Sequence, residues 1–275
     1  TVPATAIPTA APPTPTPRPP GPARTGKAPV PAVGAPYIAI VDETSGEVLY
    51  QKNGNARVAP ASCTKIVTAI VAIERGDPKQ VVRVSFDPTE LVDSTLMGIR
   101  NGDEVTLEDL LYGLMLPSGN DAALAIANHI AGSKPAFVEL MNAKVRELGL
   151  TNSQFRNPHG LDQSGHYSSA YDMIALARYG MTRQPLFVQL SKARVWEIRG
   201  SRSWEVYNLN KFLTAYRDKG ADGVKIGYTE EAGKTMVASA TRNGHRVYVA
   251  VMGSTDLVAD TVPLFDWVFA NYTWP

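Results

Sequence analysis

The feature that most constrains the fold is the position of the β-favouring segments, which lie at the two ends of the folded part of the chain. Residues 37–41 and 47–51 favour strands and are separated by the turn-like residues 42–46. Residues 235–242 and 245–253 flank Asn243-Gly244, the strongest short signal of a β-hairpin. Strands at both ends with helices between them predict an antiparallel sheet flanked by helices, with a helical lobe.

The long stretch between these hairpins shows helical periodicity. Thr106, followed by acidic residues, is typical of a helix N-cap. A doubly wound parallel sheet is disfavoured, because the chain has neither regular βαβ alternation nor a glycine-rich phosphate loop. The fold class is therefore α/β of the α+β kind. The helices we expect cover residues 65–74, 110–116, 121–131, 135–148, 169–182 and 257–271.

The first 36 residues differ in composition from the rest of the chain. They hold 12 of the 21 prolines, mixed with alanine and threonine. Such a segment cannot build a core and favours extended polyproline II, which would span about 100 Å at full length. We therefore expect residues 1–36 to be a linker and residues 37–275 to form one folded domain.

Charge and cysteine content exclude several classes of protein. The chain has 27 Lys and Arg against 26 Asp and Glu, so we expect no nucleic-acid partner. Its one cysteine, Cys63, excludes an internal disulfide. No run of 18 apolar residues is present, and the chain starts at Thr1 without a signal-peptide pattern. We therefore expect that a signal peptide or anchor has been removed or left out.

Ser62 and Lys65 form an S-x-x-K motif, the first of three short motifs that can carry chemistry. At a helix start the two residues share a face, and a lysine that loses its proton in a dry pocket can accept the serine proton. The free N–H groups of that helix start would stabilise a developing oxyanion. Taken alone, the motif more often means a capping serine and a surface lysine.

The second and third motifs are Ser118-Gly119-Asn120 and the segment 225–229. Ser118 and Asn120 can relay a proton and bind a substrate amide, or can simply cap a helix at residue 121. Lys225 followed by Gly227 on an edge strand would present a cation while a substrate backbone lies against the strand. The alternative is an ordinary strand with a solvated lysine.

In this order the three motifs resemble those of serine D-Ala-D-Ala carboxypeptidases, the low-molecular-mass penicillin-binding proteins. The likeness covers roughly residues 37–272. It implies the β-lactamase/transpeptidase-like fold, so that residues 37–275 would be the catalytic domain. The segments that carry the likeness are residues 60–65, 111–123, 157–162 and 222–233.

The resemblance implies a role for each motif residue. Ser62 would be the acylated nucleophile, Lys65 its general base, and Ser118 an assistant in proton transfer. On the substrate side, Asn120 would hold the substrate and Lys225 would help to bind its terminal carboxylate. The backbone N–H groups of Ser62 and Tyr228 would form the oxyanion hole, and Gly227 and Thr229 complete the expected substrate-binding set.

The implied reaction removes the terminal D-Ala from peptidoglycan stem peptides through an acyl-enzyme on Ser62, with no metal or cofactor. β-Lactams would inhibit by acylating the same serine. The implied location is extracytoplasmic, in the cell envelope, periplasm or medium, with a possible membrane tether upstream of Thr1.

Ile226 departs from the family pattern, because it replaces the threonine of K-T-G. An alkyl side chain cannot donate a hydrogen bond to a carboxylate. Loss of that bond would cost about 1–3 kcal/mol, or roughly ten- to hundred-fold in rate. Thr229 is a candidate replacement for the hydroxyl. A weakly active or non-catalytic peptidoglycan-binding relative is therefore an alternative.

Three further alternatives have different chemistry. A β-lactamase would need a carboxylate to activate water, and Glu147 lies in only an imperfect version of the E-x-x-L-N pattern. A transpeptidase or endopeptidase would share all three motifs. A zinc-dependent carboxypeptidase could use His159, Asp162 and His166, but no H-E-x-x-H motif supports it.

Overall fold

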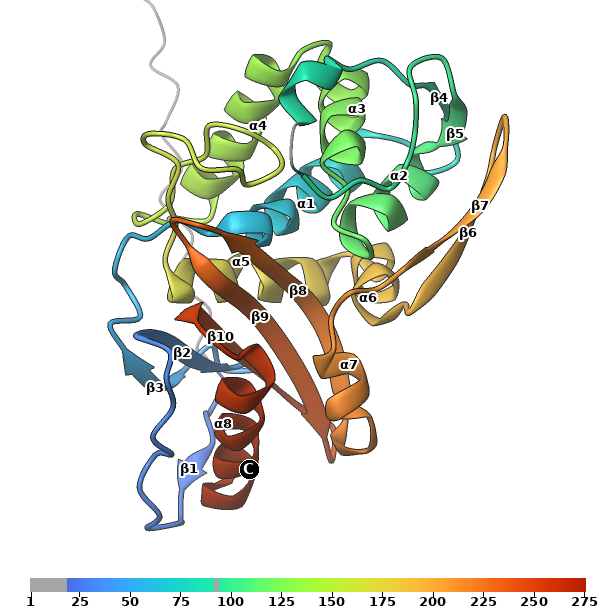
Figure 1. The fold of residues 1–275 in the computed structure, drawn as a ribbon. Coiled ribbons are helices and arrows are strands. Elements are labelled where there is room, and N and C mark those ends of the chain that lie inside the picture. Colours follow the sequence, from blue (N-terminus) through green and yellow to red (C-terminus); the bar gives the residue numbers. More distant parts are fainter. Residues whose placement is uncertain (1–18, 92–93) are drawn as a thin grey trace, which may run out of the picture.

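In a computed structural model, which describes residues 19–91 and 94–275, the chain forms a five-stranded antiparallel sheet with helices on both faces (Figure 1). The strand order is β3-β2-β10-β9-β8, so strands from the start and the end of the chain pair directly. The α+β prediction is therefore confirmed. The strands are β2 (Tyr37–Asp42), β3 (Val48–Lys52), β8 (Ala221–Thr229), β9 (Gly233–Arg242) and β10 (His245–Ser254).

The sheet divides the interior into two apolar clusters, one on each of its faces. One face of the sheet packs against α8, while α5 covers the other face (Figure 1). Around α1, helices α2, α3 and α4 form the helical lobe. The helices are α1 (Lys65–Arg75), α2 (Leu107–Met115), α3 (Asn120–Ala131), α4 (Lys134–Glu147), α5 (Ala170–Arg183), α6 (Pro185–Lys192), α7 (Phe212–Ala215) and α8 (Leu257–Asn271).

The predicted helices are confirmed, and that of residues 257–271 has the predicted bounds. Thr106 caps α2 in a reciprocal capping box with Asp109. Apolar residues every three or four positions give α4 and α5 one buried face, whereas the first two turns of α1 and α3 are buried on all sides. Within the described part of the chain, no helix is long and apolar enough to cross a membrane.

Sequence analysis missed two short ribbons outside the main sheet. They are β4 (Val81–Arg83) with β5 (Glu104–Thr106), and β6 (Val195–Arg199) with β7 (Ser203–Tyr207). The β6–β7 ribbon extends from the body of the molecule beside the helical lobe (Figure 1). It is held there by Trp196, which stacks on Tyr112 and donates a hydrogen bond to Asp109.

The folded part begins earlier than the predicted boundary at Tyr37. Strand β1 (Ala23–Arg24) pairs with β11 (Tyr272–Thr273), and the indole of Trp267 donates to the carbonyl of Ala28 at 2.9 Å. Composition could not indicate this, because a proline-rich segment can lie extended on a surface without its own core. Residues 1–18 of the predicted linker lie outside the described residues.

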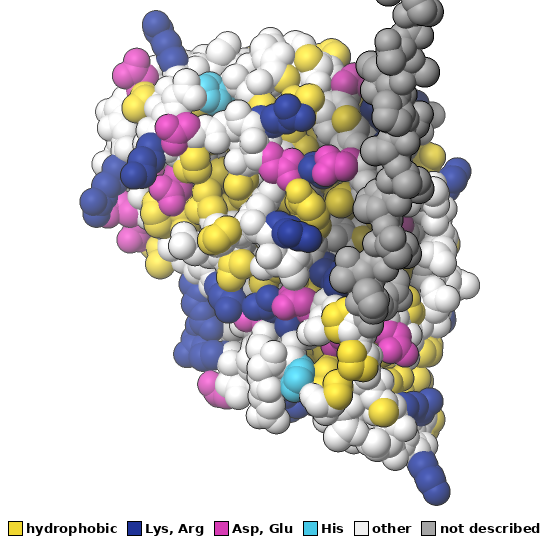
Figure 2. Space-filling model, turned by 180° about the vertical axis from the view of Figure 1, so that it is seen from behind, with side chains coloured by type: hydrophobic (Ala, Val, Ile, Leu, Met, Phe, Trp, Pro, Cys, Tyr) yellow, Lys and Arg dark blue, Asp and Glu magenta, His cyan; other side chains and the backbone are white. Residues whose placement is uncertain are grey.

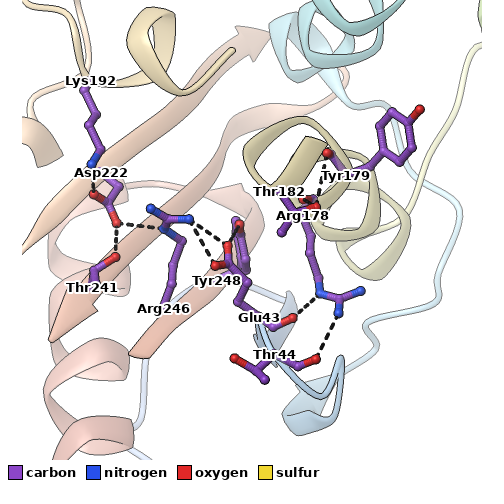
Figure 3. A network of polar contacts seen from close by, with 10 residues as sticks. All are labelled: Glu43, Thr44, Arg178, Tyr179, Thr182, Lys192, Asp222, Thr241, Arg246 and Tyr248. Atoms are coloured by element: carbon purple, nitrogen blue, oxygen red, sulfur yellow. Dashed lines mark hydrogen bonds and ion pairs between the residues drawn. The ribbon is translucent and has the colours of Figure 1, made fainter. Parts of the chain in front are cut away.

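Arg246 on β10 is the centre of a network of polar contacts (Figure 3). Its guanidinium lies 2.8 Å from Oε2 of Glu43 and 3.0 Å from Oδ2 of Asp222. Lys192 pairs with the other oxygen of Asp222 at 2.8 Å, and Tyr248 donates to Glu43. Burial and the Glu43 charge raise the pKa of Tyr248, so its hydroxyl stays protonated. The network joins the end of β2 to β8, β10 and α6.

Surface charges of both signs are interspersed on the face seen from behind (Figure 2). Lysine and arginine side chains lie among aspartates and glutamates there, with apolar side chains between them. This distribution agrees with the near balance of 27 basic against 26 acidic residues.

Candidate active site

Ser62 lies in a 3₁₀ turn, η1 (Ala61–Thr64), directly before α1. Ala61 has a positive φ of 48°, which is uncommon for a non-glycine residue. Glycines pack closely on both sides of the turn. A Cβ on Gly227 of β8 would lie 2.5 Å from the Ser62 nitrogen, and one on Gly160 would lie 1.9 Å from the Ala61 carbonyl oxygen. The serine is therefore held between β8 and the loop 157–161.

Lys65 is fully buried at the first position of α1. Its Nζ donates to Ser62 Oγ at 2.9 Å, to Asn120 Oδ1 at 2.6 Å and to the His159 carbonyl at 2.7 Å. Burial, followed by the positive charge of Lys225, holds the pKa of Lys65 well below its usual value. Lys65 is thus not a surface lysine, as the alternative interpretation of the S-x-x-K motif would have it. It lies within proton-transfer distance of Ser62.

The second motif brings Ser118 and Asn120 to the same place from the start of α3. Ser118 has φ 65°, and its buried Oγ has no hydrogen-bond partner among the described residues. The N-cap of α3 is Gly119, which has no side chain to cap the helix. The alternative in which Ser118 or Asn120 caps the helix is therefore wrong. An unpaired buried hydroxyl beside a lysine–serine pair is available to a substrate or a transferring proton.

Lys225 lies on β8, which is an edge strand of the sheet as predicted. Lys225 is only 2% exposed, so the alternative interpretation of an ordinary strand with a solvated lysine is wrong. Burial lowers the pKa of Lys225 to about 8, and its Nζ donates to the Ile226 carbonyl at 3.1 Å. A buried cation beside Lys65 both favours the neutral form of that lysine and provides charge for an anionic substrate group.

A cavity of about 660 Å³ opens above these residues. Ser62, Ser118 and Asn120 line it together with Gly227, Tyr228 and Thr229 of β8, while Lys65 and Lys225 lie buried beneath the lining.

The Thr229 hydroxyl donates to Asp162 at 2.7 Å and accepts from the Ala232 N–H at 3.1 Å. Its one proton is therefore already engaged, and Thr229 does not replace the hydroxyl that is missing at Ile226.

The histidines hold the loop against the nucleophile turn. His166 shares a 2.8 Å hydrogen bond with Thr64 Oγ1 through Nε2 and accepts the Arg156 N–H through Nδ1. Burial lowers the pKa of His166 to about 4 and that of His159 to about 3, so both are neutral at pH 7. With both ring nitrogens of His166 engaged, the zinc alternative loses a ligand, and the described residues contain no cluster suited to a metal.

The structure also places Glu147 away from the site. This residue ends α4, where its carboxylate pairs with Lys144 at 2.8 Å, and its side chain is 60% exposed. It does not line the cavity beside Ser62. The carboxylate that the β-lactamase alternative requires is therefore not supplied by Glu147.

Thr235 on β9 is a supporting residue that sequence analysis missed. Its buried hydroxyl donates to the Pro60 carbonyl at 3.0 Å and contacts Cys63 Sγ at 3.4 Å. Burial raises the pKa of Cys63, which stays a thiol, as expected for a small buried residue. The structure places Thr235 opposite Gly227 in the β8–β9 pair, and no signal in the sequence marks this position.

An antiparallel sheet, a helical lobe and a serine–lysine–asparagine cluster at their junction define the class of serine penicillin-binding proteins and β-lactamases. Within this class, a profile of the D-alanyl-D-alanine carboxypeptidase family matches residues 24–256. The chain belongs to the D-alanyl-D-alanine carboxypeptidase family.

Individual relatives agree with this assignment. D-alanyl-D-alanine carboxypeptidase DacF of Bacillus subtilis is 37% identical over 243 residues, which cover 85% of this chain and 61% of that protein. DacA of Escherichia coli is 36% identical over 253 residues, which cover 87% and 62%. The chain thus spans about three fifths of the length of these relatives.

A solved D-alanyl-D-alanine carboxypeptidase from Mycobacterium tuberculosis has the same fold. Its TM-score is 0.82 at 33% identity, and the match covers 90% of this chain and 95% of that one. The predicted β-lactamase/transpeptidase-like fold is therefore confirmed.

Proposed function

We propose that this protein is a serine D,D-carboxypeptidase that removes the terminal D-Ala from peptidoglycan stem peptides. The observation that carries the proposal is the 2.9 Å hydrogen bond between Lys65 Nζ and Ser62 Oγ at the edge of a substrate-sized cavity. Activation of a serine without a histidine requires a buried lysine, a lowered pKa of that lysine and a hydroxyl beside it. Lys65 and Ser62 meet all three requirements.

In this mechanism neutral Lys65 takes the Ser62 proton as Oγ attacks the carbonyl carbon of the penultimate D-Ala. The backbone N–H groups of Ser62 and Tyr228 stabilise the oxyanion. Ser118 then relays this proton from Lys65 to the leaving amine, the C–N bond breaks and free D-Ala departs. A water molecule next attacks the ester carbonyl and gives a proton to neutral Lys65, which returns it to Ser62 Oγ as the acid product leaves, so that Ser62 and Lys65 recover their starting states.

Substrate contacts follow from the same geometry. Asn120 holds the substrate amide, and Lys225 attracts the terminal carboxylate. Gly227, Tyr228 and Thr229 offer an edge of β8 along which the peptide lies. β-Lactams present a reactive carbonyl at the same point and would acylate Ser62.

The proposed place of action is outside the cytoplasmic membrane, where peptidoglycan is found. A proline-rich linker within residues 1–36, behind a membrane tether upstream of Thr1, would hold the domain at a distance from the bilayer. Its composition supports this arrangement, since polyproline II segments act as semi-rigid spacers.

Intact-mass measurement with benzylpenicillin tests the proposal. We expect a one-to-one adduct on the wild-type protein and none on Ser62→Ala, because Ser62 Oγ lines the cavity and lies 2.9 Å from the Lys65 amine. Ser203→Ala is the matched control, since Ser203 is exposed on β7, and it should form the adduct. An unmodified wild-type protein, without release of D-Ala from a stem peptide, would favour the non-catalytic peptidoglycan-binding alternative.

A further inference from the structure

The active-site cavity continues past Ser62 into an apolar region that the proposed mechanism does not use. We call it the apolar lobe, and its lining residues are Leu209, Ile226, Leu257 and Val258. Ile226 belongs to the apolar cluster under α8, whereas the preceding Lys225 is buried next to Cys63, whose Sγ lies 3.6 Å from the Lys225 carbonyl. Successive residues of a strand face opposite sides, so Ile226 lines the cavity while the Lys225 side chain is buried on the other side of the strand.

Charge indicates which end of a substrate lies over this lobe. The Ile226 end of the cavity has the buried cation Lys225, and Lys211 lies on its rim. At the other end, Asp162 accepts hydrogen bonds from the Thr229 hydroxyl and the Glu231 N–H. A terminal carboxylate is attracted to the first end and repelled by the second, so the C-terminal residue of the substrate lies beside Ile226.

Two other charged residues line the cavity and are engaged elsewhere. Lys234 donates to the Thr255 carbonyl at 2.6 Å, and Asp256 caps α8 by accepting the N–H groups of Val258 and Ala259. Asp256 thus lies at the edge of the apolar lobe, where its carboxylate is engaged by the first N–H groups of α8, and the lobe is otherwise walled by its four apolar side chains. A methyl group, the side chain of D-Ala, is too small to cover four apolar side chains.

We propose that the apolar lobe binds the side chain of the C-terminal D-amino acid, and that the enzyme therefore releases a large apolar D-residue, such as D-Leu, faster than D-Ala. This inference rests on the proposed function and specifies its substrate. The chemistry is unchanged: the ester bond to Ser62 Oγ forms, the bond to the leaving nitrogen breaks, and water completes hydrolysis. Burial of the leaving side chain takes the place of the hydroxyl contact that Ile226 cannot make.

The test compares two peptides, diacetyl-L-Lys-D-Ala-D-Leu and diacetyl-L-Lys-D-Ala-D-Ala. We expect kcat/KM for release of D-Leu to exceed that for D-Ala by at least about tenfold, since D-Leu adds three carbons and a single methylene in an apolar pocket is worth roughly that factor. A ratio of one or less would overturn the inference even if D-Ala release itself is efficient. Absence of release from both peptides, together with no benzylpenicillin adduct, would instead remove the proposed function and this inference with it.

Two substitutions locate the preference. Leu257→Ala removes part of the apolar wall and should lower the ratio of kcat/KM for D-Leu to that for D-Ala about tenfold. Ile226→Thr should also lower this ratio, in part by raising kcat/KM for D-Ala. Val81→Ala is the matched control, because Val81 is 61% exposed on β4 and does not line the cavity. Retention of a benzylpenicillin adduct shows that each variant is folded. A D-Leu preference that survives both substitutions would place the side chain elsewhere and overturn the inference.

Discussion

Replacement of Lys65 by methionine should lower the rate of Ser62 acylation by benzylpenicillin about 10²–10⁴-fold, the usual contribution of a general base. Methionine keeps the length of the buried side chain but cannot accept the proton of an Oγ that lies 2.9 Å from Nζ. A time course of intact mass measures the rate directly. Lys79→Met, at an exposed position after α1, is the matched control and should acylate like the wild type.

The pH dependence of acylation tests the same base in a second way. Because only neutral Lys65 accepts a proton, the wild-type rate should rise with pH until that lysine is deprotonated. The positive charge of Lys225 lowers the pKa of Lys65, so Lys225→Met should shift this rise of the acylation rate to higher pH. The measurement is the acylation rate of both proteins between pH 5 and about 10. If the acylation rates of both proteins rise over the same pH range, the titrating base is another group.

The second large effect concerns stability. Arg246→Met should lower the free energy of unfolding by about 3 kcal/mol, because the buried Asp222 and the half-buried Glu43 would keep their charges without their shared partner. For a chain of this size that corresponds to a fall in melting temperature of about 10 °C. Thermal unfolding followed by circular dichroism gives the value.

A surface ion pair provides the control for Arg246. In Arg199→Met, the lost partner is Glu197 on the same ribbon, and both side chains are largely exposed. Water solvates such a pair in either state, so the melting temperature should hardly change. Equal melting temperatures for the two variants would show that the network in Figure 3 does not stabilise the fold.

The sequence allowed prediction of those features that are encoded locally. The helix of residues 257–271 and the hairpin at Asn243-Gly244 depend on periodicity and turn chemistry within a few residues. Ser62 and Lys65 were found in the same way, because three residues of separation place them on adjoining turns. The role of each in turnover remains a prediction.

What could not be predicted depends on contacts between distant segments. The His159 carbonyl reaches Lys65 across 94 positions, and Thr235 reaches Pro60 across 175. A backbone carbonyl has no residue type to recognise, and a single threonine in a strand is common. The early start of the fold at Ala23 was hidden for a related reason, since its partner strand is at the other end of the chain.

The central position of β10 in the sheet has a consequence for synthesis. This strand pairs with β2 on one side and β9 on the other, and α8 follows it to cover the sheet. Strand β2 can pair with β3 early in synthesis, but its pairing with β10 must wait until residues 245–254 have been made. Until then the five-stranded sheet cannot form, because β10 is the strand that joins the β2–β3 hairpin to β9 and β8.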